Sequence, residues 1–415
     1  MMPFKVLIIG AVWPEPASSA AGTRLLQLIH VFQKQNWHIS FTSAAQGSEH
    51  SYQLESLNIH CFACKLNNSS FNDQVKQLQP NIVLFDRFIT EEQFGWRVKE
   101  ACPDALLMLD TIDLHCLRNE RHLALKQNRV FKFEDLLNNA IALREITSIY
   151  RCDISLMVSE IEMEILENTF KINKDLLHYC AFMFDAIEEK DILSWPSFEQ
   201  RRHFISIGNF LHEPNWDAVL YLKQNIWSGI RAKLPKAELH IYGAYASQKV
   251  LQLHNEKEGF LIKGRAENLT ETMCHARVCL APLRFGAGIK GKLADSMLYG
   301  TPNVTTAIGA ESMHGNLKWN GFVCDEEADF IEKAVQLYSD KDIWQAAQTF
   351  GVQIIHDYFE PVKSAEKLVA KIEADYQNLQ NKRQKNFLGK LLQQQHFAAS
   401  KYMSMWIEIK NKTNL

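Results

Sequence analysis

The sequence predicts an α/β protein built from two doubly wound parallel sheets that face a cleft. Two observations predict this fold class. Short apolar runs alternate with amphipathic helical patterns, and the alternation stops at a charged segment before it begins again. Apolar strands without a polar face are typical of parallel sheets that are covered by helices on both sides. At 415 residues the chain also exceeds one ordinary core, so two domains are expected.

The first series of strands occupies the N-terminal half of the chain. Helical patterns separate most of them, for example over Gly22–Gln35 and Glu91–Ala101, and a longer helical pattern spans Phe131–Ile149. The predicted strands are Lys5–Gly10, His38–Ser43, Leu57–Phe62, Asn81–Asp86, Leu106–Thr111 and Ile154–Ser159.

A charged segment over Asp185–Arg202 is predicted to link this series to a second one. We expect a first domain over residues 1–190, a second over 191–360, and C-terminal helices over 361–415 that return to the first domain. The second series of predicted strands is Phe204–Gly208, Glu238–Gly243, Phe260–Gly264, Val278–Leu283, Asn303–Thr306 and Gly321–Cys324. Its helical patterns are Trp216–Arg231, Ala246–His254, Gly291–Tyr299, Asp329–Tyr338 and Asp342–Phe359. Ligands of such folds bind at the carboxyl ends of the strands and between domains.

Composition excludes several classes of function. A net charge of −3 argues against nucleic acid as the main partner, because such binding needs a strongly basic surface. No apolar run approaches the ~20 residues of a membrane-spanning helix. The N-terminus enters a strand without a signal-peptide pattern, and the nine cysteines are interpreted as reduced core residues. We therefore expect a cytoplasmic protein.

The C-terminal segment has a different composition. Between Tyr376 and Ile407 there is no Asp or Glu, although the segment contains five Lys or Arg residues. Phe387, Leu388 and Leu391 recur at helical spacing. A terminal helix that packs on a domain is the favoured interpretation. The alternative is a basic amphipathic surface that contacts anionic lipid on the inner face of a membrane, or an acidic partner.

The most informative segment is residues 282–302, with the sequence PLRFGAGIKGKLADSMLYGTP. It follows a predicted buried strand and places glycines and two lysines, Lys290 and Lys292, at the start of a helical pattern. A glycine-rich turn that enters a helix presents unpaired N–H groups and the positive end of the helix dipole. The sequence therefore predicts an anion site, and in particular a site for a diphosphate.

Together with two Rossmann-like domains, this segment resembles the donor domain of GT-B glycosyltransferases of the retaining family 4, or group 1, type. Three further segments agree: IGNFLHEPNWDA from Ile207, LHIYG from Leu239 and GAESM from Gly309. The segment Lys401–Ile407 is similar to a last helix that crosses back to the first domain. The resemblance covers nearly the whole chain and is most specific in the second half.

The resemblance implies a retaining, metal-independent hexosyltransferase that moves a sugar from a nucleotide-diphosphate sugar to a hydroxyl of a glycan or a lipid-linked acceptor, as in polysaccharide biosynthesis. It implies no cofactor besides the donor substrate and no metal. Lys290 and Arg284 would stabilise the diphosphate leaving group, supported by Lys292. The other donor-side residues that it implies are Gly208, Asn209, Gly243, Gly286, Gly288, Ile289, Asp295 and Glu311.

The sequence departs from the family pattern at several of these positions. The family's two helix-associated carboxylates correspond to Ala287, which has no carboxylate, and to Asp295. The Arg and Lys that many members have after the first strand of the donor domain are replaced by Asn209 and Pro214. We therefore expect the glycine-rich loop to supply a larger share of the positive charge than in related enzymes.

Acceptor-side residues are expected in two loops of the first domain. One loop, rich in small residues, contains Ser19 and Gly22; a plain strand-to-helix connection is an equally good interpretation of it. The other contains Asp110, Asp113 and His115 at the end of a predicted strand, where polar groups are costly unless they are exposed or paired. A His in a comparable position of related enzymes touches the sugar, and His115 is the candidate here, beside the alternative of a capping or ion-paired histidine.

Two other classes of function remain open from the sequence. One is a GT-B sugar-nucleotide epimerase or hydrolase, which would need further acid and base carboxylates in the cleft. The other is a non-catalytic protein that binds a nucleotide sugar, which the replacements at Ala287, Asn209 and Asp295 leave open.

Overall fold

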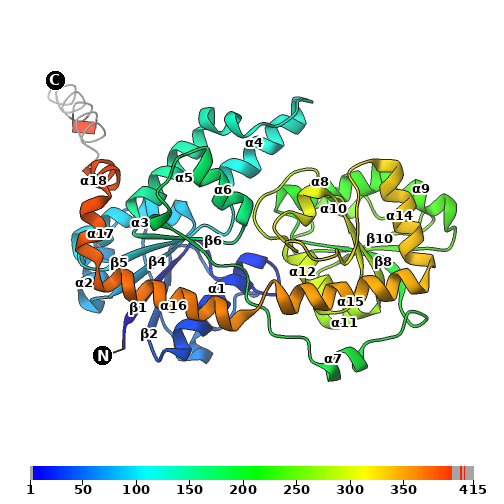
Figure 1. Ribbon diagram of the computed structural model, residues 1–415, viewed down its shortest axis with the longest axis horizontal. Coiled ribbons are helices and arrows are strands. Elements are labelled where there is room, and N and C mark those ends of the chain that lie inside the picture. The colour runs from blue at the N-terminus through cyan, green and yellow to red at the C-terminus, as the bar shows by residue number, and fades with distance from the viewer. Residues whose placement is uncertain (1–2, 395–401, 404–405, 407–415) are drawn as a thin grey trace.

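The computed structural model describes residues 3–394, 402, 403 and 406, and the described residues form two parallel sheets covered by helices (Figure 1). This arrangement confirms the predicted fold class. Both sheets are apolar on their two faces, which is why the strands appear in the sequence as short continuous hydrophobic runs. No helix in the described part of the chain is long and apolar enough to cross a membrane.

The first sheet has seven strands in the order β3-β2-β1-β4-β5-β6-β7. Their bounds are β1 Lys5–Gly10, β2 His38–Ser43, β3 His60–Ala63, β4 Ile82–Asp86, β5 Leu106–Asp110, β6 Ile154–Met157 and β7 Leu177–Tyr179. The helices that cover it are α1 Ala20–Lys34, α2 Ser70–Leu78, α3 Phe88–Ala101, α4 His115–Lys126, α5 Ala140–Arg151 and α6 Glu160–Asn168. Three short 3-10 helices lie between them at Leu54–Leu57, Phe133–Asn138 and Lys174–Leu176.

The second sheet has six strands in the order β10-β9-β8-β11-β12-β13. Their bounds are β8 Arg202–Ile207, β9 Leu239–Tyr242, β10 Phe260–Gly264, β11 Ala276–Ala281, β12 Asn303–Thr305 and β13 Gly321–Val323. Its helices are α8 Glu213–Tyr221, α9 Trp227–Lys233, α10 Gln248–Leu251, α11 Leu269–His275, α12 Gly291–Leu298, α13 Ala307–Ala310, α14 Glu327–Ser339 and α15 Lys341–Asp357, with a π-helical turn over Leu222–Ile226. A short helix, α7 Glu189–Ser194, lies in the segment between the two sheets.

Strand order fixes where a ligand can bind in each sheet. In the first sheet β1 lies between β2 and β4, and in the second β8 lies between β9 and β11. The connections that follow β1 and β4 run to opposite faces of the first sheet, and those that follow β8 and β11 do the same in the second. A crevice therefore opens at the carboxyl ends of each of these two pairs of strands. The glycine-rich loop of residues 282–290 follows β11, so the topology places it beside the loop that follows β8.

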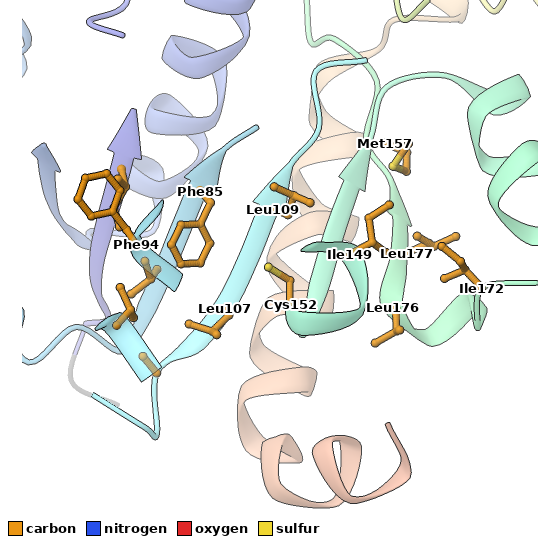
Figure 2. Packing of buried hydrophobic residues seen from close by; sticks show 14 of the residues in the cluster. Phe85, Phe94, Leu107, Leu109, Ile149, Cys152, Met157, Ile172, Leu176 and Leu177 are labelled. Atoms are coloured by element: carbon orange, nitrogen blue, oxygen red, sulfur yellow. The ribbon is translucent and has the colours of Figure 1, made fainter. Parts of the chain in front are cut away.

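The core of the first domain fixes the strands and helices behind this crevice. Figure 2 shows side chains of β4 and β5 packed with those of α3, α5, β6 and β7. Phe85 and Phe94 are buried in this cluster, and Leu107, Leu109 and Ile149 are also buried. Each buried side chain of this size contributes roughly 1.5–3 kcal/mol relative to an exposed one, so the strand ends are held on a rigid base.

The C-terminal helices α16 Pro361–Gln377, α17 Leu379–Lys385 and α18 Phe387–Gln394 return to the first domain (Figure 1). Leu368, Ile372 and Leu379 join the core beneath β1 and β4. The guanidinium of Arg383 donates to both carboxylate oxygens of Asp153, at 2.8 and 2.7 Å. The prediction of helices that cross back is therefore confirmed, whereas the segment Lys401–Ile407, to which the crossing was assigned, lies largely outside the described residues.

Several predicted elements differ from the structure. The strand expected at Leu57–Phe62 begins at His60, because Leu57 ends a 3-10 turn and Asn58 has a left-handed backbone. The long helix expected over Phe131–Ile149 is a 3-10 turn followed by α5, which begins where Asn139 caps it by accepting from the N–H groups of Ile141 and Ala142. Strand β7 and helices α4 and α6 were not predicted.

Replacement of Arg383 by Ala should destabilise the protein, because Asp153 would remain buried without its cationic partner. We expect a loss of roughly 3 kcal/mol in the free energy of unfolding. Chemical denaturation of Arg383→Ala beside Lys385→Ala, an exposed cation on the same helix, measures this. Equal stability of the two variants would contradict the tie between the C-terminal helices and the first domain.

Candidate functional site

A cleft of about 600 Å³ lies where the carboxyl ends of the two sheets face each other. Its walls come from the loops after β1, β4 and β5 in the first domain and from the loops after β8, β9, β10 and β11 in the second. These are the strand ends that the topology of both sheets predicts for a ligand.

The glycine-rich loop touches the first domain at Gly288. Its φ is +64°, in the left-handed region, and a Cβ there would lie 2.7 Å from the Cβ of Asp113 and 2.8 Å from the carbonyl oxygen of Ile112. Ile112 itself has a positive φ of 63°, which is costly for a β-branched residue. The close approach of these two loops therefore depends on glycine at position 288.

Glu162 on α6 links the two loops through one carboxylate oxygen. Its Oε1 accepts from the N–H of Gly288 at 2.8 Å and from the N–H of Leu114 at 3.0 Å. The side chain is fully buried, and Oε2 has no hydrogen-bond partner among the described residues. Burial raises the pKa of Glu162 to about 7, against the two N–H donors, which lower it. The residue after Leu114 is His115, and the residue two after Gly288 is Lys290, so this contact sets two candidate catalytic residues opposite each other.

Arg121 on α4 makes a second contact across the domains. Its guanidinium donates to the carbonyl oxygen of Gly286 at 2.8 Å and to both carboxylate oxygens of Glu311, at 3.0 and 2.7 Å. A two-bond Arg–carboxylate pair has defined geometry as well as strength. The loop between Gly286 and Gly288 is thus held at both ends by side chains of the first domain.

The two lysines of the loop lie at the cleft. Lys290 Nζ donates to the carbonyl oxygen of Gly288 at 2.8 Å, and Lys292 Nζ donates to Asn215 Oδ1 at 2.7 Å. Burial lowers the pKa of Lys290 to about 8 and that of Lys292 to about 8. Burial also raises the pKa of Asp295 to about 7, although the charge of Lys292 opposes this. Large pKa shifts of this kind are common at functional sites, because ionisable groups there are removed from water.

Gly208 leaves room beside these groups. A Cβ at this position would lie 2.6 Å from Asn215 Nδ2 and 2.9 Å from Lys292 Nζ. A larger residue would therefore fill the space in front of the lysine, and the absence of a side chain keeps that cation accessible from the cleft.

The histidines of the cleft are neutral at pH 7. Burial, together with the charge of Arg87, lowers the pKa of His115, whose Nε2 lies 3.4 Å from Asp113 Oδ1. Burial lowers the pKa of His212 to about 3, and the neighbouring cations Arg118 and Lys292 add to the effect. Neutral imidazoles donate one hydrogen bond and accept another, which suits contacts with sugar hydroxyls.

Most of the predicted site residues line the cleft, so the structure brings together residues that are up to 276 positions apart in the chain. Their chemical roles stay predictions. The predicted residues that line it are Ser19, Gly22, Asp113, His115, Gly208, Asn209, Gly243, Gly286, Ile289, Lys290, Lys292 and Asp295.

Four predicted site residues do not line the cleft. Arg284 pairs with Asp217, at 2.9 and 2.5 Å, because its side chain turns toward α8. Asp110 is fully buried, 3.5 Å from the guanidinium of Arg24. Gly288 and Glu311 are engaged by the first domain, as described above. These residues organise the walls of the cleft, and their contact with a ligand stays a prediction.

Sequence reasoning missed Glu162 and Arg121. Ser159 and Glu162 have the Ser-x-x-Glu spacing of a helix capping box, and Ser159 Oγ does accept from the N–H of Glu162. The glutamate side chain, however, turns away to the other domain. The Ser-x-x-Glu pattern indicates the start of helix α6. The contact of Glu162 with Gly288 depends on how the two domains lie against each other, which no local pattern predicts. In the described residues no group of three or more His, Cys, Asp or Glu side chains has the arrangement of a metal site.

Residues 201–340 match a family model described as "Glycosyl transferases group 1". This stretch contains β8 to β13 and the whole glycine-rich loop. The second domain is a group 1 glycosyltransferase domain. The predicted resemblance is thereby confirmed at the level of the family, and so is the predicted class of enzyme, a glycosyltransferase. A search of curated proteins finds no match to the chain.

Solved structures with the same fold cover both domains. HepE from Anabaena, in complex with UDP and glucose, matches with a TM-score of 0.64 and 13% identity over 89% of this chain and 99% of its own. Sucrose-phosphate synthase from Thermosynechococcus elongatus matches with 0.66 and 12% over 89% and 98%. The lipopolysaccharide outer core galactosyltransferase WaaB matches with 0.55 and 14% over 89% and 99%. The likeness confirms the predicted GT-B fold over both domains.

The pKa values of the two loop lysines predict an alkaline limit to activity. Both ammonium groups are charged below about pH 8 and lose their protons above it. If each must be charged to bind a diphosphate, log kcat/KM for the donor should fall above pH 8 with a slope that approaches −2, because kcat/KM reports the free enzyme. In Lys292→Arg the guanidinium stays charged, so the slope should change from −2 to −1. An unchanged profile in this variant would contradict the assignment.

Proposed function

We propose that the protein is a retaining, metal-independent glycosyltransferase that transfers a sugar from a nucleotide-diphosphate sugar to a hydroxyl acceptor. The observation that supports this most directly is the pair Lys290 and Lys292 at the cleft, on a glycine-rich loop that enters α12. A leaving diphosphate gains negative charge as its bond to the sugar lengthens, and fixed cations in a dry site lower that barrier.

Backbone groups of the loop add to these charges. The N–H groups of Gly291 and Lys292, in the first turn of α12, make no backbone hydrogen bond within the described residues. Such groups at a helix start bind phosphate. The N–H of Gly288 differs, because Glu162 already accepts from it. The N–H groups of Gly291 and Lys292 are therefore available to the donor, whereas the N–H of Gly288 binds the first domain.

The donor would lie mainly on the second domain. Gly208 and Gly243 bring the ends of β8 and β9 close to the cleft, and Asp295 on α12, which lines it, would accept from ribose hydroxyls. HepE is described in complexes with UDP and with UDP-glucose. A uridine diphosphate sugar is accordingly the first donor to test.

The acceptor would lie on the first domain, between the loop of Ser19 and Gly22 and the loop of Asp113 and His115. Neutral His115, which lines the cleft, would contact the transferred sugar. Contacts such as that of Glu162 with Gly288 close the cleft, which excludes water and favours transfer over hydrolysis. A glycan or a lipid-linked sugar, each of which has several hydroxyls, would be a suitable acceptor.

Retention of the anomeric configuration is part of the proposal because of the resemblance to retaining enzymes, and a same-face mechanism is compatible with this cleft. Ala287 stands at the position of the family's first carboxylate and supplies no nucleophile. Attack from the same face as the leaving group, with the departing phosphate taking the acceptor proton, needs no enzyme nucleophile. The lysines supply positive charge at the diphosphate, so neither a metal nor another cofactor is part of the proposal.

Contact of the C-terminal segment with an anionic membrane stays a prediction. Phe387, Leu388 and Leu391 are exposed on α18, between 50% and 71%, and Lys385 and Lys390 are exposed beside them. Apolar and basic side chains in this combination are typical of peripheral membrane helices.

Replacement of Lys290 by Ala should lower kcat by roughly 100-fold or more, because the leaving group would lose a buried charge. The assay uses purified protein with a panel of nucleotide sugars and hydroxyl acceptors, with and without EDTA, and determines the anomer of the product. Lys249→Ala, on the exposed side of α10, is the matched control. Unchanged turnover in Lys290→Ala would exclude its role, and donor turnover without any acceptor would favour a hydrolase or an epimerase.

A further inference from the structure

Arg87 has a backbone conformation that arginine rarely adopts. It lies between the end of β4 and the start of α3, with φ +71° and ψ +157°. This region is essentially restricted to glycine, because a Cβ clashes with the backbone there. Strained residues of this kind persist where the surrounding fold holds them, and they gather at functional sites. The strain indicates that the arginine side chain has a use which glycine would not serve.

The side chain of Arg87 extends to the cleft. Its Nε lies 3.3 Å from Asp86 Oδ1, and the side chain is 23% exposed. The two terminal nitrogens have no hydrogen-bond partner among the residues that the structure describes. Asp86 is itself held by the N–H of Ala11 at 3.1 Å, so this carboxylate orients the guanidinium without occupying its far end.

Arg118 on α4 presents a second guanidinium to the same cleft. One of its terminal nitrogens pairs with Asp113, and the side chain is 22% exposed. Burial lowers the pKa of Arg118, and the positive charge of Arg87 lowers it further, although Glu145 opposes both effects. Two guanidinium groups that repel each other in a partly buried site are stabilised when an oxyanion binds between them.

The environment of His212 locates this positive region. The permanent charges that lower its pKa belong to Arg118, Lys292 and Arg87, after the larger effect of burial. The imidazole therefore lies among cations from both domains. Lys292 approaches it from the second domain, whereas the two arginines approach it from the first.

We propose that Arg87 and Arg118 form a second anion site, on the first-domain wall of the cleft, that binds a phosphate group of the acceptor. The proposal rests on the function proposed above and narrows its acceptor to a phosphate-bearing molecule, such as a sugar phosphate or a lipid-linked sugar diphosphate. Guanidinium groups bind phosphate through paired N–H donors, and two of them match its charge of nearly −2.

The position of the two arginines assigns them to the acceptor. They lie in the loops after β4 and β5 of the first domain, whereas Lys290 and Lys292, proposed above to bind the donor diphosphate, belong to the second. If the acceptor is held by its phosphate at this wall, one of its hydroxyls would point toward His115 and toward the donor sugar between the domains.

Calorimetry on the UDP-saturated protein tests this site, with inorganic phosphate and glucose 1-phosphate as probes. The wild type should bind both, and Arg87→Gly should bind them at least about tenfold more weakly, because a charged hydrogen-bond donor is lost. The Tm of Arg87→Gly should be no lower than that of the wild type, because glycine relieves the backbone strain. Arg144→Ala, which removes an exposed arginine of the same domain paired with Glu92, should leave both affinities unchanged.

Four outcomes would overturn the proposal. Absence of phosphate binding to the UDP-saturated wild type, or equal binding in Arg87→Gly, removes the site. Weaker UDP binding in Arg87→Gly assigns the arginine to the donor instead. Binding of glucuronic acid without binding of either phosphate probe shows that a carboxylate is recognised. A wild type that does not bind UDP at all would contradict the proposed function itself, which separates the two failures.

Discussion

The arrangement of the cleft depends on a single buried carboxylate. Glu162 accepts from Leu114 of the first domain and from Gly288 of the second, so it fixes the loop that precedes His115 against the loop that contains Lys290. A buried carboxylate that lacks such donors is expensive, and the burial already raises its pKa to about 7. The two N–H groups therefore stabilise the buried carboxylate of Glu162, and Glu162 in turn fixes the position of the two domains relative to each other.

This constraint also explains the electrostatics of the donor side. Closure against the first domain buries the loop, and burial lowers the pKa values of Lys290 and Lys292 to about 8. Both cations are stored partly desolvated, where a charged leaving group gains more from them than it would in water. Arg121 and Glu311 neutralise each other beside the loop, so they contribute position and little net charge.

The sequence was sufficient to predict the fold class, and most of the site residues predicted from it line the cleft. Hydrophobic runs located nearly every strand, and the order of strand, glycines and lysines located a loop that lines the cleft, because both patterns are local in the chain. Among the differences at the site are two long side chains. Arg284 and Glu311 are polar residues at the expected loops, but their partners Asp217 and Arg121 are 67 and 190 positions away. Which way such a side chain turns is decided by tertiary contacts that no local pattern encodes, and the same holds for Glu162 and for the strained backbone of Arg87.

A crystal structure of the protein with bound UDP is the most direct test of this account. The account predicts that the diphosphate lies at the start of α12, within hydrogen-bond distance of Lys292 Nζ, while Glu162 still accepts from the N–H of Gly288. A nucleotide bound away from the glycine-rich loop, or a diphosphate that displaces Glu162 from Gly288, would contradict it.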